Sequence, residues 1–317
     1  MNRTFPRSIV FAAAALLALV PSALSQSEGE GQGSAIVTIL PKDAHASAPD
    51  ISEQTIHVEV NGKQSQITNW QPLRGTQAGV ELVLLIDDGA RTSLGSEFGD
   101  IRQFIQSLPP NVKISLAYME NGRAALAGPL SADHTKALQQ LQLPIGVPGQ
   151  SASPYFCLSD LAKRWPSGDT TARREVIMIT DGVDYYHLQY DPEDPYVQSA
   201  IQDSIRAHLI VYSIYWRNAG RFDRTWSAND AGQNLLLEVT AATGGNSYWI
   251  GIGNPVSLSP YFDDFGRRLN NQYELGFTAP MSGRPELASL KIKIKAPDAR
   301  VTAPQSTWLG ANQVAER

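Results

Sequence analysis

The feature that most constrains the fold is a series of continuous apolar runs separated by segments with helical spacing. The runs are "VELVLLID" (80–87), "REVIMITDG" (174–182) and "LIVYSIYW" (209–216). Strands that are apolar on both sides are typical of a parallel sheet covered on both faces. Between them, "SEFGDIRQFIQSL" (96–108) repeats its apolar residues at helical intervals. This alternation across 80–272 predicts an α/β fold with a doubly wound, mostly parallel six-stranded sheet and helices on both faces.

The segments on either side of this α/β pattern have the alternation of strands. "TIHVEV" (55–60) alternates apolar and polar residues and leads into Asn61-Gly62, a strong signal for a two-residue hairpin turn. "LKIKIK" (290–295) also alternates, so that one face of this strand is expected to meet water. A second hairpin signal, Asn121-Gly122, predicts an antiparallel edge strand within the α/β region. The α/β domain is therefore expected to be flanked by N- and C-terminal β segments.

The first residues have the pattern of a secretory signal peptide. Two arginines precede the short apolar stretch "IVFAAAALLALV", and "ALS" (23–25) provides small residues for cleavage. The apolar stretch is short for a membrane span, although a membrane anchor is the alternative interpretation. We therefore predict an exported protein, periplasmic or extracellular, with no membrane span after cleavage. The predicted division of the chain is a signal peptide over 1–25, a disordered linker over 26–34, an N-terminal β segment over 35–78, the α/β domain over 79–272 and a C-terminal β segment over 273–317.

Composition argues against several classes of function. The net charge is −5, and removal of the two arginines in 1–25 makes it −7. An acidic chain without a basic run is a poor match for nucleic acid. Cys157 is the only cysteine and lies between Phe156 and Leu158, which indicates a buried structural thiol. The sequence also lacks a nucleophile elbow, a phosphate-binding loop and zinc-ligand spacing, so we predict that the protein is not an enzyme.

Two polar turns follow two of the apolar runs. Asp87–Gly89 ends the first run, and Thr180–Gly182 ends a later one. Each could be a simple polar turn, since Asp and Gly are common there. In a parallel sheet, however, the carboxyl ends of the strands meet at one edge, where open α/β sheets bind their ligands. The pairing of the two turns therefore favours a site.

Together these residues resemble the von Willebrand factor type A (VWA) domain. The resemblance rests on a strand followed by "IDDGARTS" and a helix, then a hairpin with an edge strand, then "IMITDG", and it covers about Val80 to Gln272. The flanks "HVEVNGKQSQITNWQPL" and "YELGFTAP" resemble a secreted bacterial subfamily common in Acidobacteria. The resemblance implies a site of three loops, which supply Asp-x-Ser-x-Ser, a Thr and the Asp of a "TDG"-like turn. In the family these oxygens hold Mg²⁺ or Mn²⁺, and a carboxylate of the partner completes the shell.

The sequence departs from that family pattern at the first loop. Asp87 matches the first Asp, but Gly89 and Arg91 replace the two serines. Ser151 in "GQSAS" is the best candidate for the Thr position, and Asp181 matches the Asp of the third loop. Two hydroxyl ligands are therefore lost, and the resemblance implies a degenerate metal site at Asp87, Ser151 and Asp181.

The arginine bears directly on whether a metal binds. If the guanidinium of Arg91 points inward, it can pair with Asp87 or Asp181 and take the place of the ion, because two cations repel at short range. In the alternative, Arg91 points to solvent, and Thr92 or Ser93 helps to hold Mg²⁺ or Mn²⁺. The sequence favours the first reading, so no cofactor is expected.

Two loops beyond the turns are rich in aromatic residues. "GVDYYHLQYDPEDPY" (182–196) and "RNAGRFDRTWSAND" (217–230) both leave carboxyl ends of strands. Exposed tyrosines suit contact with a protein or a glycan, and long loops in compact domains are usually functional or disordered. The alternative is that these aromatics cap the sheet locally. The predicted ligand-binding rim is Asp88, Arg91, Tyr185, Tyr186 and Trp226.

We therefore expect a binding module that recognises a protein, or else a glycan, through the loops at the carboxyl edge of the sheet. One alternative is a structural or assembly component of the cell envelope, in which the β flanks pack on the domain or extend a partner's sheet. A hydrolase with an unrecognised site is the other.

Overall fold

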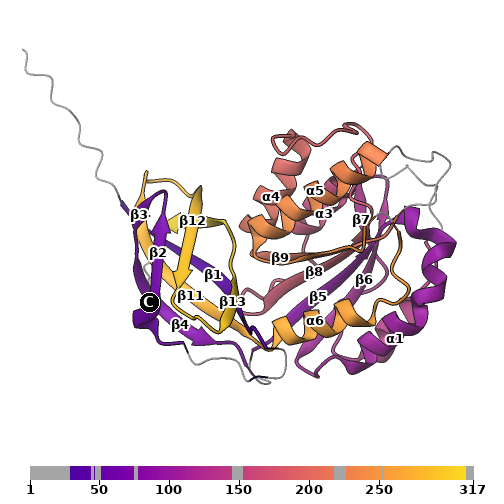
Figure 1. Cartoon of the computed structure of the whole chain (residues 1–317), viewed down its shortest axis with the longest axis horizontal. Helices are drawn as coiled ribbons and strands as arrows, with labels where there is room; N and C mark the ends of the chain where they lie inside the picture. Colours follow the sequence, from indigo (N-terminus) through magenta and orange to yellow (C-terminus); the bar gives the residue numbers. More distant parts are fainter. Residues whose placement is uncertain are drawn as a thin grey trace, which may run out of the picture.

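The computed structural model describes residues 29–43, 46, 51–74, 78–144, 153–217, 226–251 and 253–311, and at 91, 92 and 311 the backbone alone. The predicted signal peptide (1–25) lies outside the described residues. Figure 1 shows two units, an α/β unit and a smaller β unit beside it. Within the described part of the chain, no helix combines the length and apolar character needed to cross a membrane.

The α/β unit is built on a six-stranded sheet in the order β10-β9-β8-β5-β6-β7. The first five strands in this order run parallel, and β7 pairs antiparallel with β6 at one edge. Asn121 and Gly122, which join these last two strands, both have positive φ, as a tight hairpin turn requires. The predicted fold class is confirmed. The strands are β5 Val80–Ile86, β6 Val112–Glu120, β7 Arg123–Leu126, β8 Arg173–Thr180, β9 Leu209–Tyr215 and β10 Ser247–Tyr248.

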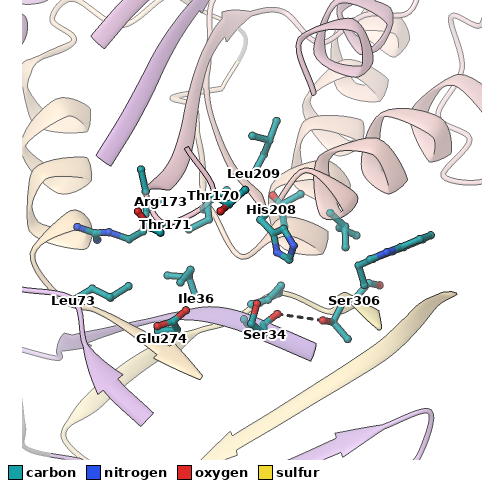
Figure 2. Close-up of a pocket in the computed structure, with 18 residues that line it drawn as sticks. Ser34, Ile36, Leu73, Thr170, Thr171, Arg173, His208, Leu209, Glu274 and Ser306 are labelled. Atoms are coloured by element: carbon teal, nitrogen blue, oxygen red, sulfur yellow. Dashed lines mark hydrogen bonds between the residues drawn. The ribbon is translucent and has the colours of Figure 1, made fainter. Parts of the chain in front are cut away.

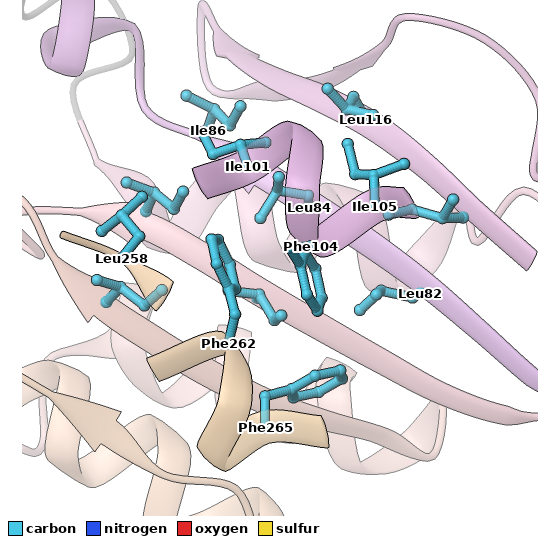
Figure 3. Close-up of a cluster of buried hydrophobic side chains, with 14 of the residues drawn as sticks. Leu82, Leu84, Ile86, Ile101, Phe104, Ile105, Leu116, Leu258, Phe262 and Phe265 are labelled. Carbon is cyan, nitrogen blue, oxygen red and sulfur yellow. The ribbon is translucent and has the colours of Figure 1, made fainter. Parts of the chain in front are cut away.

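Helices cover both faces of this sheet (Figure 1). The face covered by α1, α2 and α6 buries Leu82 and Leu84 of β5, and Phe104 of α1 stacks on Phe262 of α6 at 4.2 Å between ring centroids (Figure 3). The intervening residues of β5, such as Val83, face the layer of α3, α4 and α5. Because helices cover both faces of the sheet, every residue of β5 is buried. The helices are η1 Glu53–Thr55, η2 Asp88–Glu97, α1 Phe98–Ser107, α2 His134–Gln140, α3 Pro154–Lys163, α4 Pro195–Arg206, α5 Trp226–Thr243 and α6 Ser259–Leu269.

The two predicted β segments form a single sheet. Its order is β3-β2-β12-β14-β1-β11-β4, with β13 also paired to β1, so strands from both flanks alternate within it. The α/β unit is therefore inserted between β4 and β11, and the N–H of Leu73 donates to the carbonyl of Gln272 at 2.9 Å where the chain enters and leaves. The strands are β1 Gly29–Pro41, β2 Ile56–Val60, β3 Lys63–Gln64, β4 Gln66–Pro72, β11 Gln272–Met281, β12 Glu286–Ile294, β13 Ala299–Thr302 and β14 Ser306–Ala311.

The prediction of disorder for 26–34 is wrong from residue 29 onward. Residues 29–34 belong to β1 and pair with β11 in continuous antiparallel register. Gly31 and Gly33 make room for side chains of the neighbouring strand: a Cβ on Gly33 would lie 2.5 Å from the ring of Phe277. Glycine thus marks a close approach of a ring to the backbone here, and not an unstructured segment.

The start of α2 also differs from what its sequence predicts. In "SADHTKALQQLQL" (131–143), Ser131 is a plausible N-cap, but Asp133 is the capping residue and accepts from the N–H of Thr135 at 3.2 Å. Ser131 instead forms an antiparallel bridge with Ile114, and its hydroxyl accepts from the N–H of Asp133. The bridge to Ile114 holds Ser131 in a strand contact, so Ser131 does not cap the helix.

The two units meet at the amino ends of β8 and β9. A cavity of about 210 Å³ lies between them, lined by residues such as Arg173, His208 and Glu274 (Figure 2). Beside it, the guanidinium of Arg206 lies 4.5 Å from the ring centroid of Trp308. This cavity is at the opposite edge from the strand ends where α/β sheets bind ligands.

A buried polar network joins the units beneath this cavity. The guanidinium of Arg173 donates to the carbonyl of Leu269 at 2.9 Å and to the side chain of Gln272. The amide of Gln272 in turn donates to Glu175 Oε1 at 2.9 Å. Burial raises the pKa of Glu175 to about 7, against the opposing influence of Arg173. This carboxyl group is therefore sensitive to pH in the neutral range.

Candidate functional site at the carboxyl edge of the central sheet

The first loop of the predicted site is fastened by Asp87. Its Oδ1 accepts from the N–H of Gly89 at 2.8 Å, which caps the 3₁₀ helix η2. Its Oδ2 accepts from the hydroxyl of Thr180 at 2.5 Å, so that the ends of β5 and β8 are joined through side chains. Asp87 is buried, and both of its carboxylate oxygens already take part in bonds within the chain. This carboxylate has a clear structural role at the edge.

The turn after β8 is held from three sides. Gly182 has φ +68, and its N–H donates to the hydroxyl of Thr180 at 3.1 Å. Asp181 Oδ1 accepts from the N–H of Val183 at 3.0 Å. The buried phenol of Tyr155 on α3 donates to the carbonyl of Gly182 at 2.7 Å. Burial, together with nearby acids, raises the pKa of Tyr155 well above its usual value, so this phenol remains a donor.

The structure brings two of the predicted site residues to one edge and leaves two others undefined. Asp87 and Asp181 follow neighbouring strands, and Thr180 links the first to the turn of the second. Ser151 and the side chain of Arg91 lie outside the described residues, so the metal-site assignment remains a prediction. Asp88, expected on an exposed rim, is 2% exposed and does not belong to it.

A buried cysteine lies beneath this edge. Cys157 on α3 is fully buried, as the sequence indicated. Burial raises the pKa of its thiol, and the charges of Asp87 and Asp88 raise it further. A thiolate is the reactive form of cysteine, so these surroundings favour an inert, structural thiol.

Three of the predicted rim residues lie at the surface of this edge. The side chains of Tyr186 and Trp226 are 59% and 68% exposed, and Tyr185 is half-buried. Tyr186 also belongs to a ring cluster. It lies 5.5 Å from Phe156 and 6.0 Å from Tyr196 between centroids, and Phe156 and Tyr196 are 4.5 Å apart. The rings therefore support one another and do not lie singly on the surface.

A third loop, which sequence reasoning missed, adds to this surface. It follows β10 and exposes Trp249, Ile250 and Val256, the last at 95%. The signal was present in "YWIGIGNPV", where large apolar residues stand among glycines and a proline. The segment "NSYWI" (246–250) is predicted from its sequence to be a short strand. The observed strand ends at Tyr248.

These loops are attached to the helices beside them. The phenol of Tyr190 donates to Glu238 on α5 at 2.7 Å, and the amide of Gln233 on α5 donates to the carbonyl of Gly251 at 2.7 Å. Asp100 on α1 accepts from the hydroxyl of Ser257 at 2.6 Å and from two backbone N–H groups that follow. The Ser257 bond lowers the pKa of Asp100. The loops after β8 and β10 thus flank α5.

As a result, the exposed large hydrophobic side chains concentrate at one edge. Of the twelve such side chains among the described residues, eight lie in these loops or at the helix starts that follow them. We call this group the aromatic edge. Its members are Tyr186, Leu188, Tyr190, Tyr196, Trp226, Trp249, Ile250 and Val256.

Comparison with known proteins gives similarity of structure only. No protein-family model matches the chain, and no curated protein matches it. An aerotolerance-related membrane protein from Bacteroides fragilis is 16% identical, with a TM-score of 0.42 over 61% of this chain and 99% of that one. The conserved hypothetical protein BatB from Bacteroides thetaiotaomicron is 16% identical, with a TM-score of 0.41 over 60% and 97%. The VWA domain of SpRpn10 is 13% identical, with a TM-score of 0.37 over 58% and 94%. This similarity is too distant to transfer function.

Proposed function

We propose that the chain is a binding module that recognises a protein partner through the aromatic edge. The observation that carries the proposal is the concentration of eight exposed large hydrophobic side chains at the carboxyl ends of the strands. Exposed apolar side chains gathered in neighbouring loops are typical of interaction sites, and tyrosine and tryptophan are enriched in protein interfaces. A glycan is the less favoured ligand, because Leu188, Ile250 and Val256 offer it no hydrogen bonds.

The charges on these loops indicate what such a partner presents. Asp191, Glu193 and Asp230 are exposed beside the aromatic side chains, and the chain has a net charge of −5. Complementary charge speeds association and fixes orientation more than it adds affinity. The proposed partner surface therefore has apolar side chains at its centre and basic residues around them.

The scaffold supports binding with little reorganisation. The bonds from Tyr190 to Glu238, from Gln233 to Gly251 and from Ser257 to Asp100 attach the loops to α5 and α1. A surface that is ordered before binding loses less conformational entropy on association. Such pre-organisation favours a specific site over a merely adhesive patch.

We also propose that the site at Asp87 is degenerate and that binding does not depend on Mg²⁺ or Mn²⁺ there. Gly89 and Arg91 supply no hydroxyl ligand, and both oxygens of Asp87 accept hydrogen bonds from Gly89 and Thr180. Calorimetric titration of the full chain with Mg²⁺ is expected to give no micromolar binding. Micromolar binding that Asp87→Ala abolishes would refute this part of the proposal.

The test of the proposed function is a quantitative binding experiment. Full-length protein captures partners from envelope extract with and without chelator, and a purified captured protein is then titrated against variants. Tyr186→Ser and Trp226→Ser are each expected to weaken binding by about tenfold or more, as central aromatic contacts do. Leu287→Ser, on an exposed part of β12 in the other unit, is the matched control and should bind like wild type. Equal losses in the control and edge variants, or none in the edge variants, would overturn the proposal.

Export is a separate proposal that the sequence of residues 1–25 supports. N-terminal sequencing of the protein recovered from its native cells is expected to give a chain that begins at residue 26. An intact residue 1 in a cytoplasmic fraction would contradict it.

A further inference from the structure

Three side chains that the proposed function does not use converge in the loop between β8 and α4. Asp184, His187 and Asp194 each offer one metal-ligating atom, and these atoms lie within 4.8 Å of one another. Asp184 and Asp194 are 1% and 3% exposed, whereas His187 is open to solvent. The cluster is therefore closed by protein on one side and accessible on the other.

Backbone groups orient both carboxylates in the same manner. Oδ1 of Asp184 accepts from the N–H of Tyr186 at 2.8 Å. Oδ1 of Asp194, which caps α4, accepts from the N–H of Tyr196 at 2.8 Å and of Val197 at 3.3 Å. In each case Oδ1 is occupied, and Oδ2 is left for another partner.

The two remaining oxygens differ in what they contact. Oδ2 of Asp194 contacts Nδ1 of His187. Oδ2 of Asp184 is fully buried and accepts no well-formed hydrogen bond from any described residue. A buried carboxylate oxygen without a donor is costly unless a cation or proton compensates it. This atom belongs to a carboxylate that clusters with a histidine and a second carboxylate, and it points to a missing ligand.

The charge balance of the cluster agrees with this geometry. Asp184 and Asp194 are two buried carboxylates, and the imidazole of His187 lies within reach of both. A divalent cation would neutralise both.

We propose that Asp184, His187 and Asp194 form a binding site for a divalent transition-metal ion of the Zn²⁺ type. One imidazole nitrogen and two carboxylate oxygens suit Zn²⁺, whereas Mg²⁺ prefers oxygen ligands alone. The exposed side of His187 leaves a fourth position for water. Ligand atoms around Zn²⁺ are about 3.3 Å apart. To admit the ion, His187 would move away from Asp194, which it contacts, and the wider separations within the cluster would close. The exposed His187 side chain can provide this adjustment. The backbone N–H bonds to Oδ1 hold the carboxylates in orientation, as outer hydrogen bonds do at metal sites.

Metal binding here would fix part of the aromatic edge, a consequence that rests on the proposed function. The ion would join Asp184, at the start of the loop, to Asp194, at the cap of α4. Tyr186 and Tyr196 lie between and beside these ligands, and His187 stacks near Tyr196 with 6.1 Å between centroids. The loop that presents these tyrosines would then be closed at both ends.

The site is tested by titration of the full chain, free of any affinity tag, with ZnCl₂ by calorimetry and equilibrium dialysis. We expect saturable binding of one Zn²⁺ per chain, with affinity reduced about tenfold or more in His187→Gln. His57→Gln, an exposed histidine on β2, is the matched control and should bind like wild type. Asp184→Asn should also lose binding. If this buried substitution impairs folding, as judged by circular dichroism, the exposed His187→Gln still decides the question.

Two outcomes would overturn the site: no saturable Zn²⁺ binding by wild type, or equal affinity in His187→Gln. The thermal midpoint gives an independent readout, since Zn²⁺ should raise it in wild type and not in His187→Gln. Failure of this site and failure of the proposed function are distinguishable. Zinc binding is measured without a partner, and the Trp226→Ser comparison is measured without zinc.

Discussion

Gly182 and Gly232 are in backbone contact across the carboxyl edge of the central sheet. A Cβ on Gly182 would lie 2.5 Å from the carbonyl oxygen of Gly232, and a Cβ on Gly232 would lie 2.3 Å from the carbonyl oxygen of Asp181. Helix α5 thus rests directly on the turn after β8. This contact fixes how far α5 lies from the turn. It thereby also fixes the position of Trp226, at the start of α5, relative to the turn.

The contact predicts a large effect of Gly182→Ala. The substitution strains a positive φ and also forces α5 outward, so it should lower the free energy of unfolding by about 3 kcal/mol or more. Gly122→Ala is the matched control, because its φ is +71 but its Cβ would meet nothing closer than 3.6 Å. It should cost about 1–2 kcal/mol. Urea denaturation measures both, and equal losses would show that α5 does not press on the turn.

The bond between Thr180 and Asp87 predicts a cost for Thr180→Val. The change keeps the shape of the side chain but removes the donor from a buried carboxylate, which should cost about 1–3 kcal/mol. Thr171→Val removes a similar bond, from an exposed threonine to Asp169 at 2.7 Å, and should change stability by less than about 0.5 kcal/mol. Chemical denaturation tests the difference. A neutral Thr180→Val would mean that water or another group serves Asp87 equally well.

The raised pKa of Glu175 predicts that the protein loses stability as the pH rises through the neutral range. Its pKa is about 7 in the folded chain and near 4.5 when exposed, so the folded state binds more protons between these values. Stability should then fall from about pH 4.5 to pH 7, by roughly 3 kcal/mol from this group. Glu175→Gln should flatten the decline, whereas the exposed Glu53→Gln should leave it unchanged. Unfolding free energies at several pH values decide it, and identical profiles for all three proteins would contradict the assignment.

The lowered pKa of Asp100 predicts the opposite dependence of stability on pH. Its pKa is lowered, chiefly by the Ser257 hydroxyl, so its contribution is present above about pH 4 and is lost as the pH falls below that value. Asp100→Ala should accelerate amide hydrogen exchange at Leu258 and Ser259, whose N–H groups donate hydrogen bonds to the Asp100 carboxylate. Asp263→Ala, at an exposed site on α6, is the control. Unchanged exchange at 258 and 259 would show that other contacts hold the loop.

The central sheet could be predicted because its signals are local. A strand covered on both faces must be apolar along its length, and β5 is buried at every position. The hairpins at Asn61-Gly62 and Asn121-Gly122 needed only adjacent residues with positive φ, and all four have it. The pairing of Asp87 with the Thr180–Gly182 turn likewise followed from strand direction alone.

What could not be predicted depends on contacts between distant segments. Gly33 lies under Phe277, more than 200 residues later in the chain, and a glycine-rich stretch shows no sign of such a partner. The burial of Asp88 depends on the path of η2. From sequence alone, an Asp that follows a strand can be either buried or exposed. The exposure of Trp249 depends on where β10 ends, and strand ends are poorly marked in sequence.

The insertion of the α/β unit into the β sheet has a mechanical consequence. Gly31 at the start of β1 pairs with Ala311 at the end of β14, while Leu73 and Gln272 are bonded at the entry and exit of the inserted unit. Tension applied between residues 29 and 311 would therefore separate β1 from β14 first. As long as the strands of the β sheet stay paired, this force would not be transmitted through the α/β unit. The aromatic edge would therefore keep its shape while the chain is under tension.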